Sequence, residues 1–256
     1  MTFLIGAAFF FFGAICASFI GVVVARLHTG QSFLAGRSRC DACGMPLVPF
    51  TLVPIFSHVA MRGRARCCGA RVSPLAPLSE FLLGALFVLA YLSAGITPVL
   101  PLLLLALSLL LALVLYDLAH QILPPVLLGA FVVAAAATGF LSASSLEAFA
   151  GTLTAALFIA GSLALIHYLS GGRAMGFSDA PLSFGLALLA GPAALPGFIF
   201  SFWIGAVIGI VLLARRPAGS RMGVEVPFAP FLAAGFILAY FTQWNPFTLI
   251  SALYLY

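Results

Sequence analysis

Two acidic residues border long apolar segments of this chain. Asp117 lies in "VLYDLAHQILPP" and Asp179 in "AMGFSDAPLS", although Asp and Glu together number only six among 256 residues. A charged side chain costs about 2.5 to 3.5 kcal/mol at the centre of a bilayer and less near its edges, so such residues are usually functional. Two carboxylates at one depth can share a proton, so that one takes a proton from water and the other donates to a carbonyl. They are therefore candidate catalytic groups of an aspartic protease.

Each acid also has a structural interpretation. Asp179 suits the N-cap of a helix whose first turn contains Pro181, where a missing N–H has no cost. Asp117 is harder to explain in this way, because an acid at a helix C-terminus opposes the helix dipole. If both are catalytic, the same dipoles predict Asp179 as the base and Asp117 as the acid.

Apolar helices must position these residues. Hydrophobic residues make up 64% of the chain and charged residues 7%, whereas soluble domains are about half apolar and a quarter charged. Because about 20 apolar residues cross a bilayer, we expect an all-α polytopic membrane protein. Its eight predicted helices lie near 3–25, 79–95, 98–116, 124–140, 148–169, 180–191, 196–214 and 228–243. The first is too long for a signal peptide, and we expect it to be retained.

All eleven cationic side chains are arginines, and they follow the first, fifth and seventh predicted helices. They are Arg26, Arg37, Arg39, Arg62, Arg64, Arg66, Arg71, Arg173, Arg215, Arg216 and Arg221. With eight membrane-spanning helices, these regions lie on the same side of the membrane. The positive-inside rule predicts that this side is cytoplasmic, so both termini are expected outside. Orientation and anionic membrane lipid explain the net charge of +5, and no nucleic-acid partner is expected.

Four cysteines lie in the Arg-rich loop between the first two predicted helices. Cys40 and Cys43 form C-x2-C, and Cys67 and Cys68 are adjacent. Paired C-x2-C motifs are typical of tetrahedral zinc, and cytoplasmic thiols remain reduced. The second pair departs from that spacing, and we expect one zinc ion held by Cys40, Cys43, Cys68 and a fourth ligand that is Cys67 or His58. A metal-free or partly oxidised loop is the alternative.

Three further polar residues have two interpretations or none. Glu80, at the start of the second predicted helix, could bind substrate or cofactor, or could simply suit a helix N-terminus. His120, one turn after Asp117, could tune the acid pair or lie in a solvated loop. The sequence identifies no partner for His167.

Six stretches, in order along the chain, carry a resemblance to one family. They are "ASFIGVVVARL", "RCDACGMPL", "RGRARCCGARVSPLAPLSEFLLG", "YDLAHQILP", "MGFSDAPL" and "VPFAPFLAAG". With them the chain resembles the type IV prepilin peptidases, polytopic aspartic proteases of the bacterial inner membrane, over nearly its whole length. In that family the fourth and fifth stretches carry the catalytic aspartates, which implies this role for Asp117 and Asp179. The second and third resemble the family's two cysteine knuckles.

The sequence departs from the family pattern at several positions. Where the family has Gly-x-Gly-Asp followed by x-Lys, this chain reads Gly176-Phe177-Ser178-Asp179-Ala180-Pro181. Ser178 lacks the freedom of glycine to take positive φ, which predicts a different turn or an altered substrate geometry in the loop Gly176, Phe177 and Ser178. Gly21 replaces the family's Asn, and the third cysteine position falls on Ala65.

The resemblance implies cleavage of the leader of a prepilin or pseudopilin just after a glycine, at the cytoplasmic membrane face. Many family members then methylate the new N-terminus with S-adenosylmethionine, an activity associated with the cytoplasmic loop. The expected division is a first helix at 1–26, a Cys/Arg-rich loop at 27–78 and a transmembrane peptidase core at 79–256. The sequence does not identify the pilin.

Two other classes of function are consistent with the same residues. In a proton-coupled transporter, Asp117 and Asp179 would relay protons, but such sites usually lie near the midplane between repeats. Both acids lie instead at predicted helix ends, and no internal repeat is visible. The other alternative is a non-catalytic assembly protein with a metal-bound knuckle.

Overall fold

The computed structural model describes residues 2–27, 29, 32, 38–40, 42–215 and 226–246. Three arginines used to predict orientation, Arg37, Arg216 and Arg221, lie outside these ranges. Within them every regular element is a helix, and two isolated bridges pair Arg39 with Pro46 and Arg64 with Arg71. This confirms the all-α polytopic architecture. The chain divides into two compact units, Met1–Leu115 and Tyr116–Tyr256.

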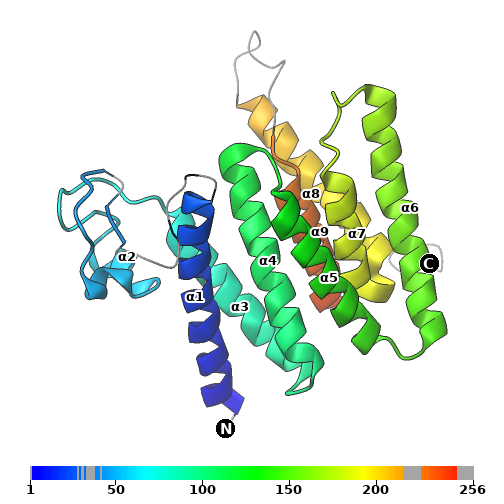
Figure 1. The fold of residues 1–256 in the computed structure, drawn as a ribbon, viewed down its shortest axis with the longest axis horizontal. Coiled ribbons are helices and arrows are strands. Elements are labelled where there is room, and N and C mark those ends of the chain that lie inside the picture. Colours follow the sequence, from blue (N-terminus) through cyan, green and yellow to red (C-terminus); the bar gives the residue numbers. More distant parts are fainter. Residues whose placement is uncertain are drawn as a thin grey trace, which may run out of the picture. The chain divides into compact units, whose positions relative to one another are not determined.

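The first unit is built on two long helices that pack together, α1 (Thr2–Arg26) and α3 (Leu75–Ala94) (Figure 1). A Cβ added to Gly13 of α1 would lie 2.7 Å from the carbonyl oxygen of Leu83 in α3. Only a residue without a side chain permits this approach, which is how transmembrane helices commonly pack. The connecting loop contains the short helices η1 (Pro49–Leu52) and α2 (Phe56–Ala60), and most of α4 (Val99–His120) also belongs to this unit.

The second unit surrounds one short central helix. After the last turn of α4 it contains α5 (Pro125–Ser142), α6 (Leu146–Ser170), α7 (Asp179–Ala190), η2 (Gly191–Ala193), α8 (Ala194–Ala214) and α9 (Ala229–Thr242). Helix α7 packs against α5, α6, α8 and α9 (Figure 1). A Cβ on Gly185 of α7 would lie 2.8 Å from the ring of Phe131 in α5, so glycine allows the close packing there. Asp179 is the first residue of this enclosed helix.

Helices form in all eight predicted ranges, but their lengths differ from those predicted. Within the described residues, six stretches are long and apolar enough to cross a membrane, with α7 and α8 counted as one. Helix α7 has 12 residues, or about 18 Å at 1.5 Å per residue, less than the bilayer core of about 30 Å. Most of its residues are buried by neighbouring helices, so it need not match the bilayer thickness.

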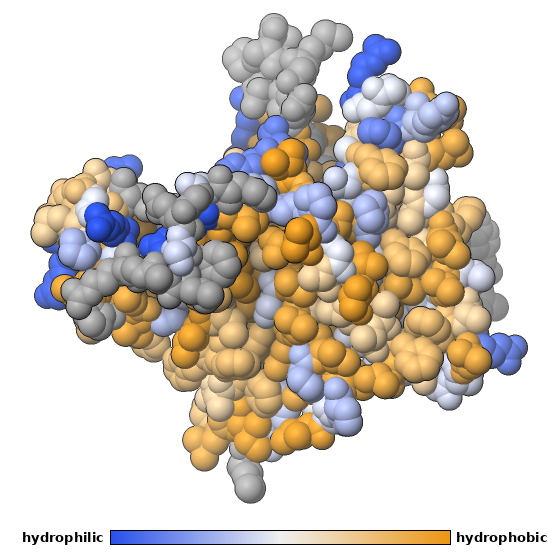
Figure 2. Space-filling view, in the orientation of Figure 1, coloured by the Kyte–Doolittle hydropathy of each residue, from blue (hydrophilic) through white to orange (hydrophobic). Residues whose placement is uncertain are grey.

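The outer surface is apolar, as contact with lipid requires. Phe158 of α6 is 72% exposed and Val133 of α5 is 70% exposed, whereas soluble proteins rarely expose large contiguous apolar patches. Figure 2 shows hydrophobic residues over the visible face of α5 and α6, while hydrophilic residues gather around the loop that contains α2. The protein is thus a multi-pass membrane protein.

Two predicted helix boundaries were wrong, and each correction changes where a candidate residue lies in its helix. Helix α4 continues to His120 rather than ending near 116, so Asp117 lies within its last turn. Helix α3 begins at Leu75 rather than 79, so Glu80 lies in its second turn. Pro77 explains the early start, because proline is tolerated in the first turn of a helix.

Candidate active site

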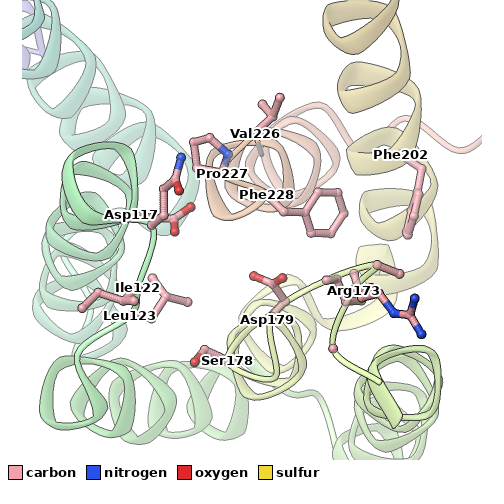
Figure 3. Close-up of a pocket in the computed structure, with 15 residues that line it drawn as sticks. Asp117, Ile122, Leu123, Arg173, Ser178, Asp179, Phe202, Val226, Pro227 and Phe228 are labelled. Carbon is pink, nitrogen blue, oxygen red and sulfur yellow. The ribbon is translucent and has the colours of Figure 1, made fainter. Parts of the chain in front are cut away.

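A cavity of about 840 Å³ in the second unit contains both candidate aspartates. Its walls are the end of α4 with the following turn, the loop between α6 and α7, the segment Val226–Phe228 before α9, and Phe202 of α8. Figure 3 shows the carboxylates of Asp117 and Asp179 pointing into this shared space. Both are buried, with 7% and 8% of their surfaces exposed. Residues 62 positions apart along the chain therefore offer two carboxylates to one cavity.

Asp117 has a partner that sequence reasoning did not find. Its Oδ2 atom accepts a hydrogen bond of 3.2 Å from the backbone N–H of Ala229, the first residue of α9. This N–H would otherwise be one of the unpaired donors at a helix N-terminus. The sequence hinted at this partner only through the stretch "VPFAPFLAAG", whose prolines favour the start of a helix. The second carboxylate oxygen of Asp117 has no hydrogen-bond partner among the described residues, and Asp117 lines the cavity.

Asp179 is not the N-cap of its helix. That position belongs to Ser178, which makes no side-chain cap hydrogen bond, and Asp179 is the first helical residue. Its carboxylate lies beside the preceding loop, because a Cβ added to Gly176 would lie 3.7 Å from Asp179 Oδ2. The N-cap interpretation of Asp179 was therefore wrong.

Of the three predicted substrate-loop residues, two line the cavity. Gly176 and Ser178 do so, whereas Phe177 is 63% exposed and packs its ring against His167. His120 is exposed at the end of α4, packs against the Tyr116 ring, and is not part of the cavity wall.

The four loop cysteines meet in the first unit. Their sulfur atoms all lie within 4.8 Å of one another, with separations of 3.8 Å for Cys40 and Cys68, 3.3 Å for Cys43 and Cys67, and 3.9 Å for Cys67 and Cys68. Four sulfurs bound to zinc at about 2.3 Å in a tetrahedron lie about 3.8 Å apart. The donor set and its spacing therefore fit a zinc ion. His58 is not part of the group, and its buried Nδ1 atom has no partner among the described residues.

Two equivalent turns create this cluster. In the first, Gly44 N–H donates to Cys40 O at 2.8 Å; in the second, Gly69 N–H donates to Ala65 O at 2.8 Å. Both glycines have positive φ, of 71° and 70°, a conformation that glycine adopts without strain. Ala65 thus occupies the place that corresponds to Cys40.

The cysteine missing at position 65 is replaced within the same turn. Cys68 corresponds to Cys43, and the additional Cys67 brings its thiol to 3.3 Å from Cys43. The sequence left Cys67 and His58 open as the fourth ligand, and the structure places Cys67 in the cluster.

Hydrogen bonds within the cluster give its thiols different pKa values. The backbone N–H groups of Cys43 and Ala42 lower the pKa of Cys40 to about 7, whereas the bond with Cys43 raises the pKa of Cys67 to about 12. A thiolate at Cys40 is thus available near neutral pH, and a bound metal would displace protons from the other thiols.

Comparison with known proteins identifies the family. Residues 11–94 match the model of the Bacterial Peptidase A24 N-terminal domain. A prepilin leader peptidase/N-methyltransferase of Bacillus subtilis is 33% identical over 235 residues, which are 90% of this chain and 92% of the relative. A protein of the same name from Klebsiella pneumoniae is 35% identical over 206 residues, 76% of this chain and 89% of the relative. The chain belongs to the prepilin leader peptidase/N-methyltransferase family. No solved structure matches it.

Family membership confirms the resemblance seen in the sequence and gives no support to a proton-coupled transporter. A further family member, from Myxococcus xanthus, is 36% identical over 222 residues, covering 84% of this chain and 66% of the relative.

The departure from the family's Gly-x-Gly-Asp pattern has a simple backbone explanation in this family member. Ser178 lies in the right-handed helical region, with φ −65° and ψ −18°, where serine is not strained. Gly176 is not among the residues with positive φ either. Neither residue before Asp179 therefore needs the backbone freedom of glycine, and a Cβ at position 176 would meet Asp179 Oδ2 at an ordinary contact distance of 3.7 Å.

Glu80 has a structural partner in this family member. The carboxylate is buried, with 8% exposed, and Oε2 accepts a hydrogen bond of 2.7 Å from the backbone N–H of Ile55. Ile55 has positive φ, 62°, which is rare for a β-branched residue. Glu80 therefore ties the cysteine-containing loop to α3 at a position of unusual backbone geometry.

Proposed function

We propose that this protein is a membrane aspartic endopeptidase that removes the leader of a prepilin or pseudopilin. One observation supports this most directly: two buried carboxylates, Asp117 on α4 and Asp179 on α7, face the same cavity. The relatives are named as prepilin leader peptidases, which supplies the class of substrate.

The reaction uses the carboxylates of both Asp117 and Asp179, which together form a catalytic dyad. One takes a proton from a water molecule, and the oxygen of that water bonds to the carbonyl carbon of the scissile peptide. The other gives its proton to the carbonyl oxygen. When the C–N bond breaks, the amine leaves with a proton from the dyad, and a carboxylic acid and an amine result. The hydrogen bond from Ala229 orients Asp117 for this exchange.

The location of the dyad suits a substrate anchored in the membrane. Asp117 is in the last turn of α4 and Asp179 in the first turn of α7, so both lie at helix ends. A leader that ends where a transmembrane helix begins presents its scissile bond at this depth. The arginine distribution supports a position of both aspartates at the cytoplasmic face of the bacterial inner membrane. It also supports a location of both termini outside.

The cysteine cluster is proposed to hold one structural Zn²⁺. Cys40, Cys43, Cys67 and Cys68 would be its ligands, and the ion would organise a loop with few buried side chains of its own. Methylation of the new N-terminus with S-adenosylmethionine is a second proposed activity, supported by the names of the relatives.

The test is leader removal from a prepilin by the full chain purified in detergent. Asp117→Asn and Asp179→Asn are compared with Glu147→Gln, which changes an exposed acid in the first turn of α6. Because general acid–base catalysis is worth about 100-fold to 10,000-fold, we expect each Asp variant to lose at least about 100-fold in kcat. Glu147→Gln should keep the activity of the parent. Near-parental cleavage by a folded Asp variant would refute the dyad.

A further inference from the structure

His167, in the last turn of α6, is enclosed by the loop that leads to Asp179. Its Nδ1 atom lies 2.9 Å from the carbonyl oxygen of Met175. Because a carbonyl oxygen can only accept, Nδ1 must carry the hydrogen. The ring also meets the edge of Phe177, with ring centroids 5.6 Å apart and an interplanar angle of 65°. One histidine thus contacts two residues that lie just before the aspartate.

The start of the loop is shaped around the same side chain. Gly171 and Gly172 have positive φ, of 59° and 77°, and Gly172 N–H donates to His167 O at 2.9 Å. A Cβ on Gly172 would lie 3.3 Å from Cε1 of the His167 ring. The chain therefore turns sharply at the end of α6 and returns across the imidazole.

The far side of this loop forms one wall of the active-site cavity. Arg173, Met175 and Gly176 all line the cavity, and Gly176 lies against Asp179 Oδ2. His167 itself is not part of the wall. It therefore contacts the cavity wall through the loop.

We propose that His167 is a positioning residue, which holds the loop between α6 and α7 so that Asp179 faces Asp117. This inference rests on the proposed peptidase function and extends it to a residue outside the cavity. Without the bond to Met175, the start of the loop keeps the bond from Ala174 N–H to Ser170 Oγ, but the loop loses the bond that holds it at Met175, next to Gly176. A displacement of about 1 Å at reacting groups can cost about 100-fold in rate.

Two variants separate the hydrogen bond from the bulk of the ring. His167→Asn places an amide N–H close to the position of the imidazole Nδ1 and can still donate to Met175 O. His167→Leu fills similar space but cannot donate. We expect kcat for prepilin cleavage to fall at least about 10-fold in His167→Leu and to recover most of that loss in His167→Asn. The control is His120→Leu, which changes an exposed histidine outside the cavity and should keep the parental rate.

A second measurement does not depend on catalysis. Amide hydrogen exchange of residues 171–178, in the full chain in detergent, should be faster in His167→Leu than in the parent and near the parental rate in His167→Asn. Unchanged exchange in His167→Leu, parental kcat in that variant, or equal losses in both variants would each overturn the proposal. A parent that fails to cleave prepilin while its exchange pattern follows the prediction would instead refute the proposed function.

Discussion

The backbone N–H of Ala229 donates a hydrogen bond of 3.2 Å to Oδ2 of Asp117, across 112 positions of sequence. The bond joins the first residue of α9 to the last turn of α4. Asp117 thus experiences the N-terminus of α9 as well as the C-terminus of its own helix, and the two dipoles act in opposite directions. The prediction of Asp179 as base and Asp117 as acid used the dipoles of their own two helices and did not consider that of α9; it stays a prediction.

Removing the N–H of Ala229 should impair catalysis without removing either carboxylate. Ala229→Pro deletes the donor at the first helical position, although Phe228 before it has helical φ and ψ, which a following proline disfavours. Ala229→Gly keeps the donor. A hydrogen bond to a charged group contributes about 1.5 to 3 kcal/mol, so we expect kcat to fall about 10-fold to 100-fold in Ala229→Pro and little in Ala229→Gly. Cleavage assays with thermal unfolding in detergent measure both effects. Equal rates in the two variants would show that the bond does not orient Asp117.

Side-chain size at position 176 should control access of Asp179 to the cavity. A Cβ at this position meets Asp179 Oδ2 at an ordinary contact distance of 3.7 Å, so Gly176→Ala should be tolerated. Gly176→Val adds methyl groups beyond that contact and should lower kcat several-fold or more. Ser178→Gly, which restores the family glycine, should be neutral because Ser178 is unstrained. The measurement is kcat for prepilin cleavage by each variant. An unimpaired Gly176→Val enzyme would contradict the steric explanation.

Variants of Glu80 distinguish its two interpretations. Gln keeps an oxygen that can accept from Ile55 N–H, whereas Ala leaves this donor unpaired, at a cost of about 1 to 3 kcal/mol. If Glu80 is structural, Glu80→Gln should keep cleavage and methylation, and Glu80→Ala should lower the unfolding temperature. If its charge binds substrate or cofactor, Glu80→Gln should lose activity while its unfolding temperature is unchanged.

The cysteine cluster should tolerate relocation of one thiol within its turn. Cys67→Ser should reduce bound zinc, while His58→Ala should retain it. The double variant Ala65→Cys/Cys67→Ala should recover about one zinc per chain, because position 65 corresponds to Cys40 in the other turn. Mass spectrometry of freshly purified protein measures the metal content. Substoichiometric zinc in the parent, with all four thiols open to alkylation, would refute the site.

The sequence by itself determined which segments are helical and which residues are chemically unusual. Long apolar runs form helices in a membrane because the backbone must satisfy its own hydrogen bonds there, so all eight predicted ranges are helical. Acids are rare in such a chain, and the position of Asp117 and Asp179 beside long apolar segments, together with the family resemblance, singled them out. The clustered cysteines led to the prediction of a metal-binding loop, and the structure brings their four sulfurs together.

Only the tertiary structure decided how these residues meet. The enclosure of the short helix α7, the bond from Ala229 to Asp117, the choice of Cys67 over His58, and the contact of His167 with Met175 all depend on packing between elements. Local patterns of hydrophobicity and turn residues set each helix separately, because their energies come from neighbours in the chain. Contacts between distant residues depend instead on which helices pack together and in what register, and a single sequence carries that information only in the sum of many small packing interactions.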